Sequence, residues 1–257
     1  MLFEVSIGIL LPFLGTTFGA ACVFFMRKTL NDLTKKAICG FAGGVMIAAS
    51  VWSLLIPSLE YESSKVLGFF SFIPALSGLW LGVVFLIAMD KILPEPSFND
   101  PPSGLKENRM LVWSVSLHNL PEGMAVGIIY AAMISSGSYE NLSGAFALSL
   151  GIAIQNFPEG AIVSTPLASD GMKKEKAFLY GFVSGIIEPL GALITILALS
   201  VVIPLLPYLL GFAAGAMIYA VIKELTPIIT KDERSNIGVL FFTLGFSFMM
   251  MLDVTLG

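Results

Sequence analysis

Long apolar stretches, separated by short charged clusters, run through the whole chain. Because a hydrocarbon core of about 30 Å requires about 20 apolar residues per helix, the sequence divides into eight candidate spans. We expect spanning helices near residues 5–26, 37–59, 67–89, 110–136, 143–168, 177–202, 207–228 and 235–256. One longer polar loop remains, at 92–109. The pattern predicts an all-α polytopic membrane protein with a single transmembrane domain over residues 1–257.

The composition agrees with this pattern. Of the 257 residues, 56% are hydrophobic and 12% are charged, and the mean hydropathy is +0.88. These values lie far outside the range of soluble globular proteins. The charge distribution suggests no nucleic-acid partner.

Basic residues collect in alternate loops. Lysine and arginine resist translocation and accumulate on the cytoplasmic side of a membrane. Thirteen of the 14 basic residues flank the inner ends of the spans in this scheme, and only Lys65 lies in the other set of loops. The distribution supports eight spans and predicts that both termini face outward.

Two pairs of internal repeats recur on spans that run in opposite directions. GFAGGVMIAAS (40–50) and GFAAGAMIYAV (211–221) agree at seven of eleven positions, and HNLPEG (118–123) matches QNFPEG (155–160). Opposed repeats of this kind are typical of inverted-topology transporters, and they predict a 3+2+3 arrangement around a central helix pair. The alternative is that two apolar helices have converged on small residues for close packing.

The hexapeptides place polar side chains inside apolar spans. Residues four apart share one face of a helix, so His118 stacks with Glu122, and Gln155 with Glu159. An asparagine three residues before each glutamate borders the same face. Pro121 and Pro158 remove one helical hydrogen bond each. Oxygen and nitrogen donors therefore converge where the two copies face each other.

Glu188, in SGIIEPLGA of the sixth span, adds a third carboxylate near the bilayer centre. A charged carboxylate there costs roughly 2.5–3.5 kcal/mol, and three would cost on the order of ten. No lysine or arginine lies in the middle of any span. Either the glutamates are protonated, which burial promotes, or a shared cation neutralises them.

The donor types favour a divalent transition ion. One imidazole, several carboxylate and amide oxygens, and the thioether of Met46 or Met217 form a borderline set that suits zinc and its neighbours better than calcium. The donors are more numerous and individually weaker than those of a closed structural zinc site. Each methionine is also an ordinary packing residue.

Four segments resemble the ZIP (Zrt/Irt-like) divalent metal transporters, nearest the bacterial GufA-like and ZupT-like branch. They are HNLPEG, QNFPEG, SGIIEPLGA and GFAGGVMIAASVWSLLIPSLE. The resemblance covers all eight spans. It implies a transporter rather than an enzyme, which moves zinc into the cytoplasm across the cell (inner) membrane through a binuclear centre. Cd²⁺, Fe²⁺ and Mn²⁺ are alternative substrates, and a homodimer is implied because family members are dimers.

The resemblance also assigns residues. For one metal position it implies Met46, His118, Glu122, Gln155 and Glu159. Glu122 and Glu159 would bridge to a second position that uses Asn119, Asn156 and Glu188. On the transport pathway it implies Ser53, Glu60 and Asp253.

The chain departs from the family pattern in three places. Gln155 stands where many members have histidine, and Asn156 where close relatives can have aspartate, so both donors are weaker. The loop at 92–109 contains no histidine, although it is histidine-rich in many relatives. That loop therefore gives no support for intracellular metal capture.

Three other functions are rivals to transport. An intramembrane metalloprotease needs an HExxH motif, which a chain with one histidine lacks. A sodium-coupled carrier is disfavoured because His118 beside Glu122 is a poor sodium site. A passive divalent channel with the same ligands stays open, and only the saturation and pH dependence of flux separate it from a carrier.

Overall fold

The computed structural model describes residues 2–25, 31–61, 68–92, 105–136, 142–169, 171–230 and 235–256. These ranges contain helices joined by short turns and no strand, so the all-α prediction is confirmed for the described part of the chain. The long helices are α1 (Leu2–Phe25), α2 (Asp32–Ala49), α5 (Ile73–Ile92), α6 (Leu105–Ser136), α7 (Leu142–Ser169), α8 (Lys174–Leu197), α10 (Leu206–Ala220) and α12 (Ile237–Leu256). The short helices are η1 (Ser50–Leu55), α3 (Ile56–Glu60), η2 (Gly68–Phe70), α9 (Leu199–Val202), η3 (Val221–Leu225) and α11 (Thr226–Thr230).

Seven helical stretches in the searched part of the chain are long and apolar enough to cross a membrane. They correspond to seven of the eight predicted spans, and α6 occupies the position of the remaining one. The predicted loop at 92–109 is shorter than expected, because α6 already begins at Leu105, and residues 93–104 lie outside the described part. The sixth span also ends early, at Leu197, before the separate turn of α9.

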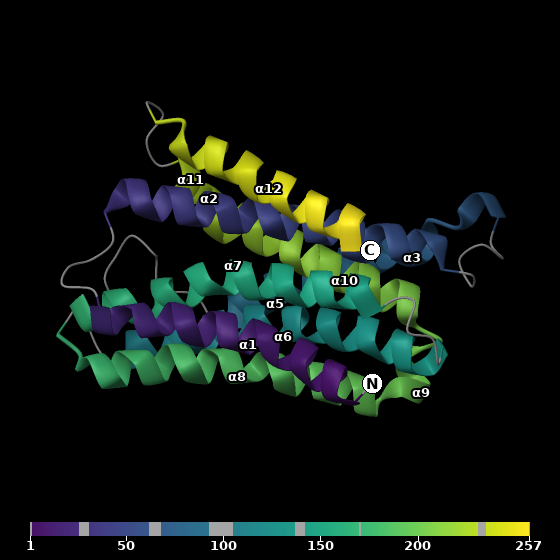
Figure 1. Cartoon of the computed structure of the whole chain (residues 1–257), viewed down its shortest axis with the longest axis horizontal. Coiled ribbons are helices and arrows are strands. Elements are labelled where there is room, and N and C mark those ends of the chain that lie inside the picture. Colours follow the sequence, from purple (N-terminus) through teal and green to yellow (C-terminus); the bar gives the residue numbers. More distant parts are fainter. Residues whose placement is uncertain are drawn as a thin grey trace.

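The helices run side by side along the long axis of the molecule, and both termini lie at the same end (Figure 1). The lysines with described side chains belong to helix ends at the opposite end of the bundle. They are Lys35 and Lys36 on α2, Lys91 on α5, Lys173, Lys174 and Lys176 at the start of α8, and Lys223 on η3. The bundle is thus polarised in charge along its axis.

The helices form two groups that recur below. In the first helix group, α1 packs on α7 and α8, and α6 packs on α8. In the second helix group, α2 with its continuation η1–α3 packs on α12, and α10 packs on α5. Figure 1 shows α1, α7 and α8 side by side, with α2 and α12 as a separate layer.

Glycines let helices within one group approach each other closely. A Cβ on Gly15 of α1 would lie 2.0 Å from the carbonyl oxygen of Ala153 on α7, and one on Gly44 of α2 would lie 2.0 Å from the carbonyl oxygen of Phe242 on α12. Both distances are impossible for a real side chain, so these helix pairs depend on glycine. Between the groups, Gly151 of α7 faces the flexible thioether of Met249 on α12 instead of a backbone.

The predicted repeats coincide with matching irregularities. The aligned segments 40–50 and 211–221 end at Ser50 and Val221, and each of these residues begins a π-helical turn, η1 or η3. A third pair, which the sequence analysis did not identify, is GILLP (8–12) in α1 and GIIEP (185–189) in α8, with three identities and a proline inside each helix.

Candidate metal centre

The two hexapeptides meet between α6 and α7. Glu122 and Gln155 are both buried, and the Gln155 side-chain amide donates from Nε2 to Glu122 Oε1 at 2.8 Å. Both helices continue through their prolines, Pro121 and Pro158. The predicted juxtaposition of the two polar motifs is therefore present in the fold.

Glu188 joins this region from α8. Its oxygen Oε1 accepts a hydrogen bond from Asn119 Nδ2 of α6 at 3.0 Å and one from Thr16 Oγ1 of α1 at 2.6 Å. The Asn119 amide also donates to the backbone carbonyl of Ser184 at 3.2 Å. Glu188 itself is 1% exposed. Three helices of the first helix group thus share one buried carboxylate.

These hydrogen bonds leave several buried polar atoms of this region, mostly acceptors, without partners in the described part of the chain. They are the oxygens Asn119 Oδ1, Glu122 Oε2, Gln155 Oε1, Glu188 Oε2 and Asn156 Oδ1, and the nitrogen Asn156 Nδ2. Each amide nitrogen of Asn119 and Gln155 donates to a glutamate, so each amide presents its oxygen as the spare acceptor. A buried acceptor without a partner costs about 1–3 kcal/mol, and more when charged. This layer of oxygens has the chemistry of a cation site.

Two other predicted ligands belong to the same helices. Glu159 lies one turn after Gln155 on α7 and is half-buried. His118 lies in α6, directly before Asn119, and its side chain is outside the described residues. Among the described side chains, no three from histidine, cysteine, aspartate or glutamate gather closely enough to hold a metal. The oxygen layer instead combines two glutamates with three amides.

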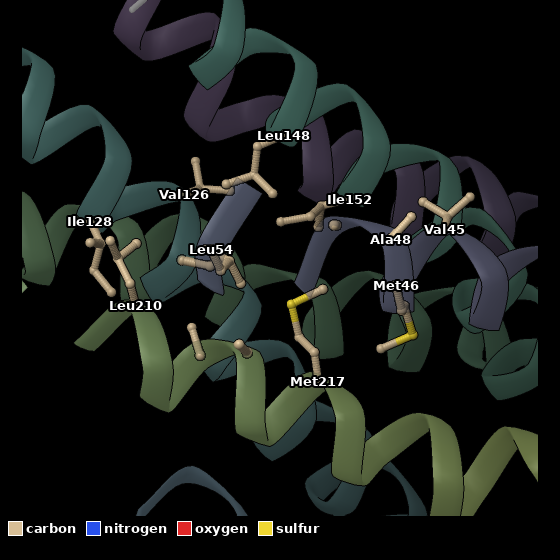
Figure 2. Close-up of a cluster of buried hydrophobic side chains, with 14 of the residues drawn as sticks. Val45, Met46, Ala48, Leu54, Val126, Ile128, Leu148, Ile152, Leu210 and Met217 are labelled. Carbon is tan, nitrogen blue, oxygen red and sulfur yellow. The ribbon is translucent and has the colours of Figure 1, made fainter. Parts of the chain in front are cut away.

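Met46 lies in an apolar cluster next to this layer. Its side chain is buried on α2, and Met217 is buried on α10. Figure 2 shows both thioethers on opposing helices, among side chains that include Leu54, Leu148 and Ile152. This cluster, called the apolar seal below, joins the second helix group to α6 and α7.

Beyond the apolar seal, a cavity of about 690 Å³ lies at the end of the bundle that carries the termini. Leu148 and Leu210, two members of the apolar seal, line it, and so do the three predicted pathway residues Ser53, Glu60 and Asp253. Ser53 donates from Oγ to Asp253 Oδ1 at 2.5 Å, while Glu60 is exposed. The structure therefore brings the pathway residues together in one cavity.

Thr16 is the site-region residue that the sequence analysis missed. It is fully buried in α1 and contacts Glu188, which lies 172 positions later in the chain. Neither threonine of the Thr16–Thr17 pair in this apolar helix belongs to a recognisable motif. The GILLP–GIIEP repeat was the available signal, since it pairs α1 with the helix that carries Glu188.

Comparisons with known proteins agree with these features. The family model for ZIP zinc transporters matches residues 106–253, more than half of the chain. "Zinc transporter ZIP11" of Xenopus tropicalis is 32% identical over 98% of this chain and 96% of its own length. "Zinc transporter ZIPB" of Bordetella bronchiseptica is 34% identical over 95% of this chain and 79% of its own, and "Zinc transporter GufA" of Myxococcus xanthus is 30% identical over 88% and 90%. The resemblance noted in the sequence is confirmed, and this chain belongs to the ZIP zinc transporter family.

Proposed function

We propose that this protein is a membrane transporter that carries zinc into the cytoplasm through the oxygen layer between α6, α7 and α8. The observation that carries the proposal is the set of buried acceptors without partners, two of them on glutamates. Five of these six atoms are oxygens, and the one nitrogen, Nδ2 of Asn156, can donate to at most two of them. The remaining oxygens need another donor or a cation. A divalent ion that visits the layer meets this need and explains why the polar residues are kept at this depth.

The ligand set fits zinc and related ions. Carboxylate and amide oxygens together with the single imidazole of His118 form a borderline donor set. Zn²⁺ is the substrate named for the relatives described above, and Cd²⁺, Fe²⁺ and Mn²⁺ suit similar donors. Conduction also requires binding that is firm enough to remove water and loose enough to allow release, and neutral amides supply the weaker part.

Two metal positions are supported by how the donors pair. Gln155 is hydrogen-bonded to Glu122, whereas Asn119 is hydrogen-bonded to Glu188. The first pair belongs to the proposed position with Met46, His118, Glu122, Gln155 and Glu159. The second belongs to the position with Asn119, Asn156 and Glu188. Glu122 and Glu159 would bridge the two positions.

The proposed route begins in the 690 Å³ cavity. Glu60 and Asp253 give it a negative lining that raises the local concentration of cations. In this proposal the apolar seal lies between the cavity and the oxygen layer, because Leu148 and Leu210 line the cavity and belong to the same buried cluster as Met46. A barrier of this kind favours a carrier over the rival passive channel, which needs a continuous path.

We propose that the two helix groups move relative to each other to pass the barrier. Backbone contacts at glycine join helix pairs within each group, such as α1–α7 and α2–α12, while side chains such as Met249 meet across the boundary. An apolar crevice of about 540 Å³ lies along this boundary, lined by residues of α1 and α7 on one side and of α2 and α12 on the other. A shear between the groups would therefore leave the close backbone contacts at glycine within each group intact.

The proposed topology has eight spans in a 3+2+3 inverted arrangement, with α6 as a span and both termini outside. In this arrangement α1 corresponds to α8, α2 to α10, α5 to α12 and α6 to α7. The packing supports it, because the α1–α7 contact has its counterpart in the α8–α6 contact, and the α2–α12 contact in the α10–α5 contact. The lysines at the end opposite the termini support the orientation. A homodimer and a cell (inner) membrane location, which the family resemblance implies, complete the proposal.

The test is zinc uptake by proteoliposomes that contain the purified protein. The native protein should show saturable uptake, and Glu122→Ala and Glu188→Ala should each lower it by at least about tenfold, the lower end of the effect of perturbing a metal site. Glu175→Ala, at an exposed position in the first turn of α8, is the matched control and should leave uptake unchanged. Uptake that never saturates would favour the channel, and full activity in both glutamate variants would refute the site.

A further inference from the structure

Glu188 is held by donors from two other helices, and both donors use the same oxygen. Thr16 Oγ1 lies 2.6 Å from Oε1, and Asn119 Nδ2 lies 3.0 Å from it. The Thr16 hydroxyl has another acceptor nearby, the carbonyl of Pro12, but at 3.5 Å. A hydroxyl carries one proton, and the shorter distance is typical of a hydrogen bond between a hydroxyl and a carboxylate. The hydroxyl therefore donates to Glu188.

The position of Thr16 is set by close backbone packing. A Cβ on Gly160 of α7 would lie 2.0 Å from the Thr16 carbonyl oxygen, and one on Gly185 of α8 would lie 3.0 Å from the Thr16 Cβ. The backbones of α7 and α8 thus press on α1 from two sides at this residue. Thr16 is also fully buried and β-branched, so its side chain has few alternative rotamers. The Thr16 hydroxyl is therefore held in one position relative to Glu188.

We propose that Thr16 is a positioning residue for the transported ion, acting through Glu188. The inference rests on the proposed function, because it assumes that Glu188 contacts the ion. Thr16 and Asn119 occupy Oε1, so Oε2 is the oxygen that remains without a partner in the described part of the chain. Glu188 therefore binds the ion through one oxygen, in an orientation that α1 imposes.

The hydroxyl has a role that packing alone does not explain. A valine at position 16 would fill nearly the same volume in the narrow space beside Gly185. It would, however, leave Oε1 with only the Asn119 amide and allow the carboxylate to rotate. Partners that orient a ligand typically contribute 10- to 100-fold to metal affinity. A serine keeps the hydroxyl and loses only a methyl group.

The experiment compares zinc uptake by proteoliposomes containing native protein, Thr16→Val, Thr16→Ser and Thr195→Val. Thr195 is the control because it is a buried threonine on α8 whose hydroxyl donates to a carbonyl of its own helix, that of Gly191 at 2.8 Å. We expect Thr16→Val to raise the KM for zinc by about tenfold with a smaller change in kcat. Thr16→Ser should restore a KM near the native value, and Thr195→Val should keep it.

A native KM in Thr16→Val would overturn the proposal, as would an equal loss in Thr195→Val, which would indicate a general packing effect. If native liposomes take up no zinc, the proposed function fails, and infrared spectroscopy still tests the contact. The carboxyl band that disappears in Glu188→Gln should shift in Thr16→Val and stay in place in Thr195→Val. An unshifted band would show that Thr16 does not orient Glu188.

Discussion

Helices pack closely at glycine in both helix groups, but the two groups bury different kinds of side chain. Close backbone contacts at glycine join helix pairs within each group, at Gly15 in the first and Gly44 in the second. Their interiors differ, however, because most buried polar side chains, including Glu122 and Glu188, belong to the first helix group. The second helix group presents mainly an apolar surface, with Met46 and Leu54 in the apolar seal.

Under the proposed function, this difference would let one membrane protein both bind an ion and keep it from leaking. The first helix group concentrates polar side chains among helices that pack closely at glycine. The second helix group supplies an apolar wall and the outer charges Glu60 and Asp253. Among its polar contacts, Tyr219 and Lys223 both donate to Asp90. In the proposed mechanism, transport requires movement at the boundary between the two groups, which side chains line.

The largest expected effect on transport comes from removing one carboxylate charge from the first helix group. Glu122→Gln keeps the shape of the side chain but replaces an anionic oxygen with an amide. We expect zinc uptake to fall below detection, because an amide is a much weaker ligand for a divalent ion. Uptake of radioactive zinc by proteoliposomes measures this, with Glu175→Gln as the exposed control. Substantial uptake in Glu122→Gln would mean that the ion does not need this carboxylate.

A second test addresses rigidity inside a group. Gly43 and Gly44 are neighbours on α2, but a Cβ on Gly44 would lie 2.0 Å from the Phe242 carbonyl oxygen, whereas one on Gly43 would meet only side-chain atoms at 3.5 Å. Gly44→Ala should therefore destabilise the protein by about 1–3 kcal/mol, a typical cost of overpacking. Gly43→Ala should be close to neutral. Thermal unfolding in detergent compares the two, and equal stabilities would contradict the close approach of α2 and α12.

A third test addresses the boundary between the groups. A Cβ on Gly151 would displace the Met249 thioether, whose sulfur lies 2.4 Å from the added atom. Because a methionine side chain can rearrange, we expect Gly151→Ala to keep its thermal stability within about 1 kcal/mol of native. The maximal uptake rate should change several-fold, since the boundary has to shear. A native rate would indicate that this boundary does not move during transport.

The smallest effect is expected in the outer cavity. Asp253→Asn removes a charge at the cavity but leaves an oxygen that can accept the Ser53 hydrogen bond. The KM for zinc should rise about twofold at low ionic strength, and the difference should fade at about 0.15 M salt, where charges are screened beyond about 8 Å. Initial uptake rates at several salt concentrations measure this. A difference independent of salt would argue for direct coordination by Asp253.

Much of the fold could be predicted from the sequence, because each helix that crosses the lipid bilayer needs about 20 predominantly apolar residues. The repeat at 40–50 and 211–221 also predicted equivalent positions on two helices. It could not predict the π-helical turns that begin at Ser50 and Val221, since widened turns depend on packing against neighbours rather than on local pattern. The start of α6 at Leu105 was likewise missed, because a Pro-rich segment precedes it.

The candidate site was predictable where the motif itself contains the chemistry. The HNLPEG–QNFPEG pair predicted that the two copies face each other, and Gln155 of one copy donates a hydrogen bond to Glu122 of the other. The motif did not predict which atoms remain without partners, because that depends on hydrogen bonds between helices. Thr16 illustrates the limit, since its contact with Glu188 joins the first helix to the sixth predicted span. The metal-ligand roles remain proposals.

Zinc binding in the oxygen layer is tested most directly by anomalous X-ray scattering at the zinc edge from crystals of the zinc-loaded protein. If zinc binds in the oxygen layer, a peak should lie at coordination distance, about 2.0–2.2 Å, from oxygens of Glu122 and Glu188, with Glu188 contacting zinc through one oxygen only. The peak should disappear in crystals of Glu122→Gln. Zinc found only at Glu60 and Asp253 or elsewhere on the surface, with the oxygen layer empty, would contradict the account.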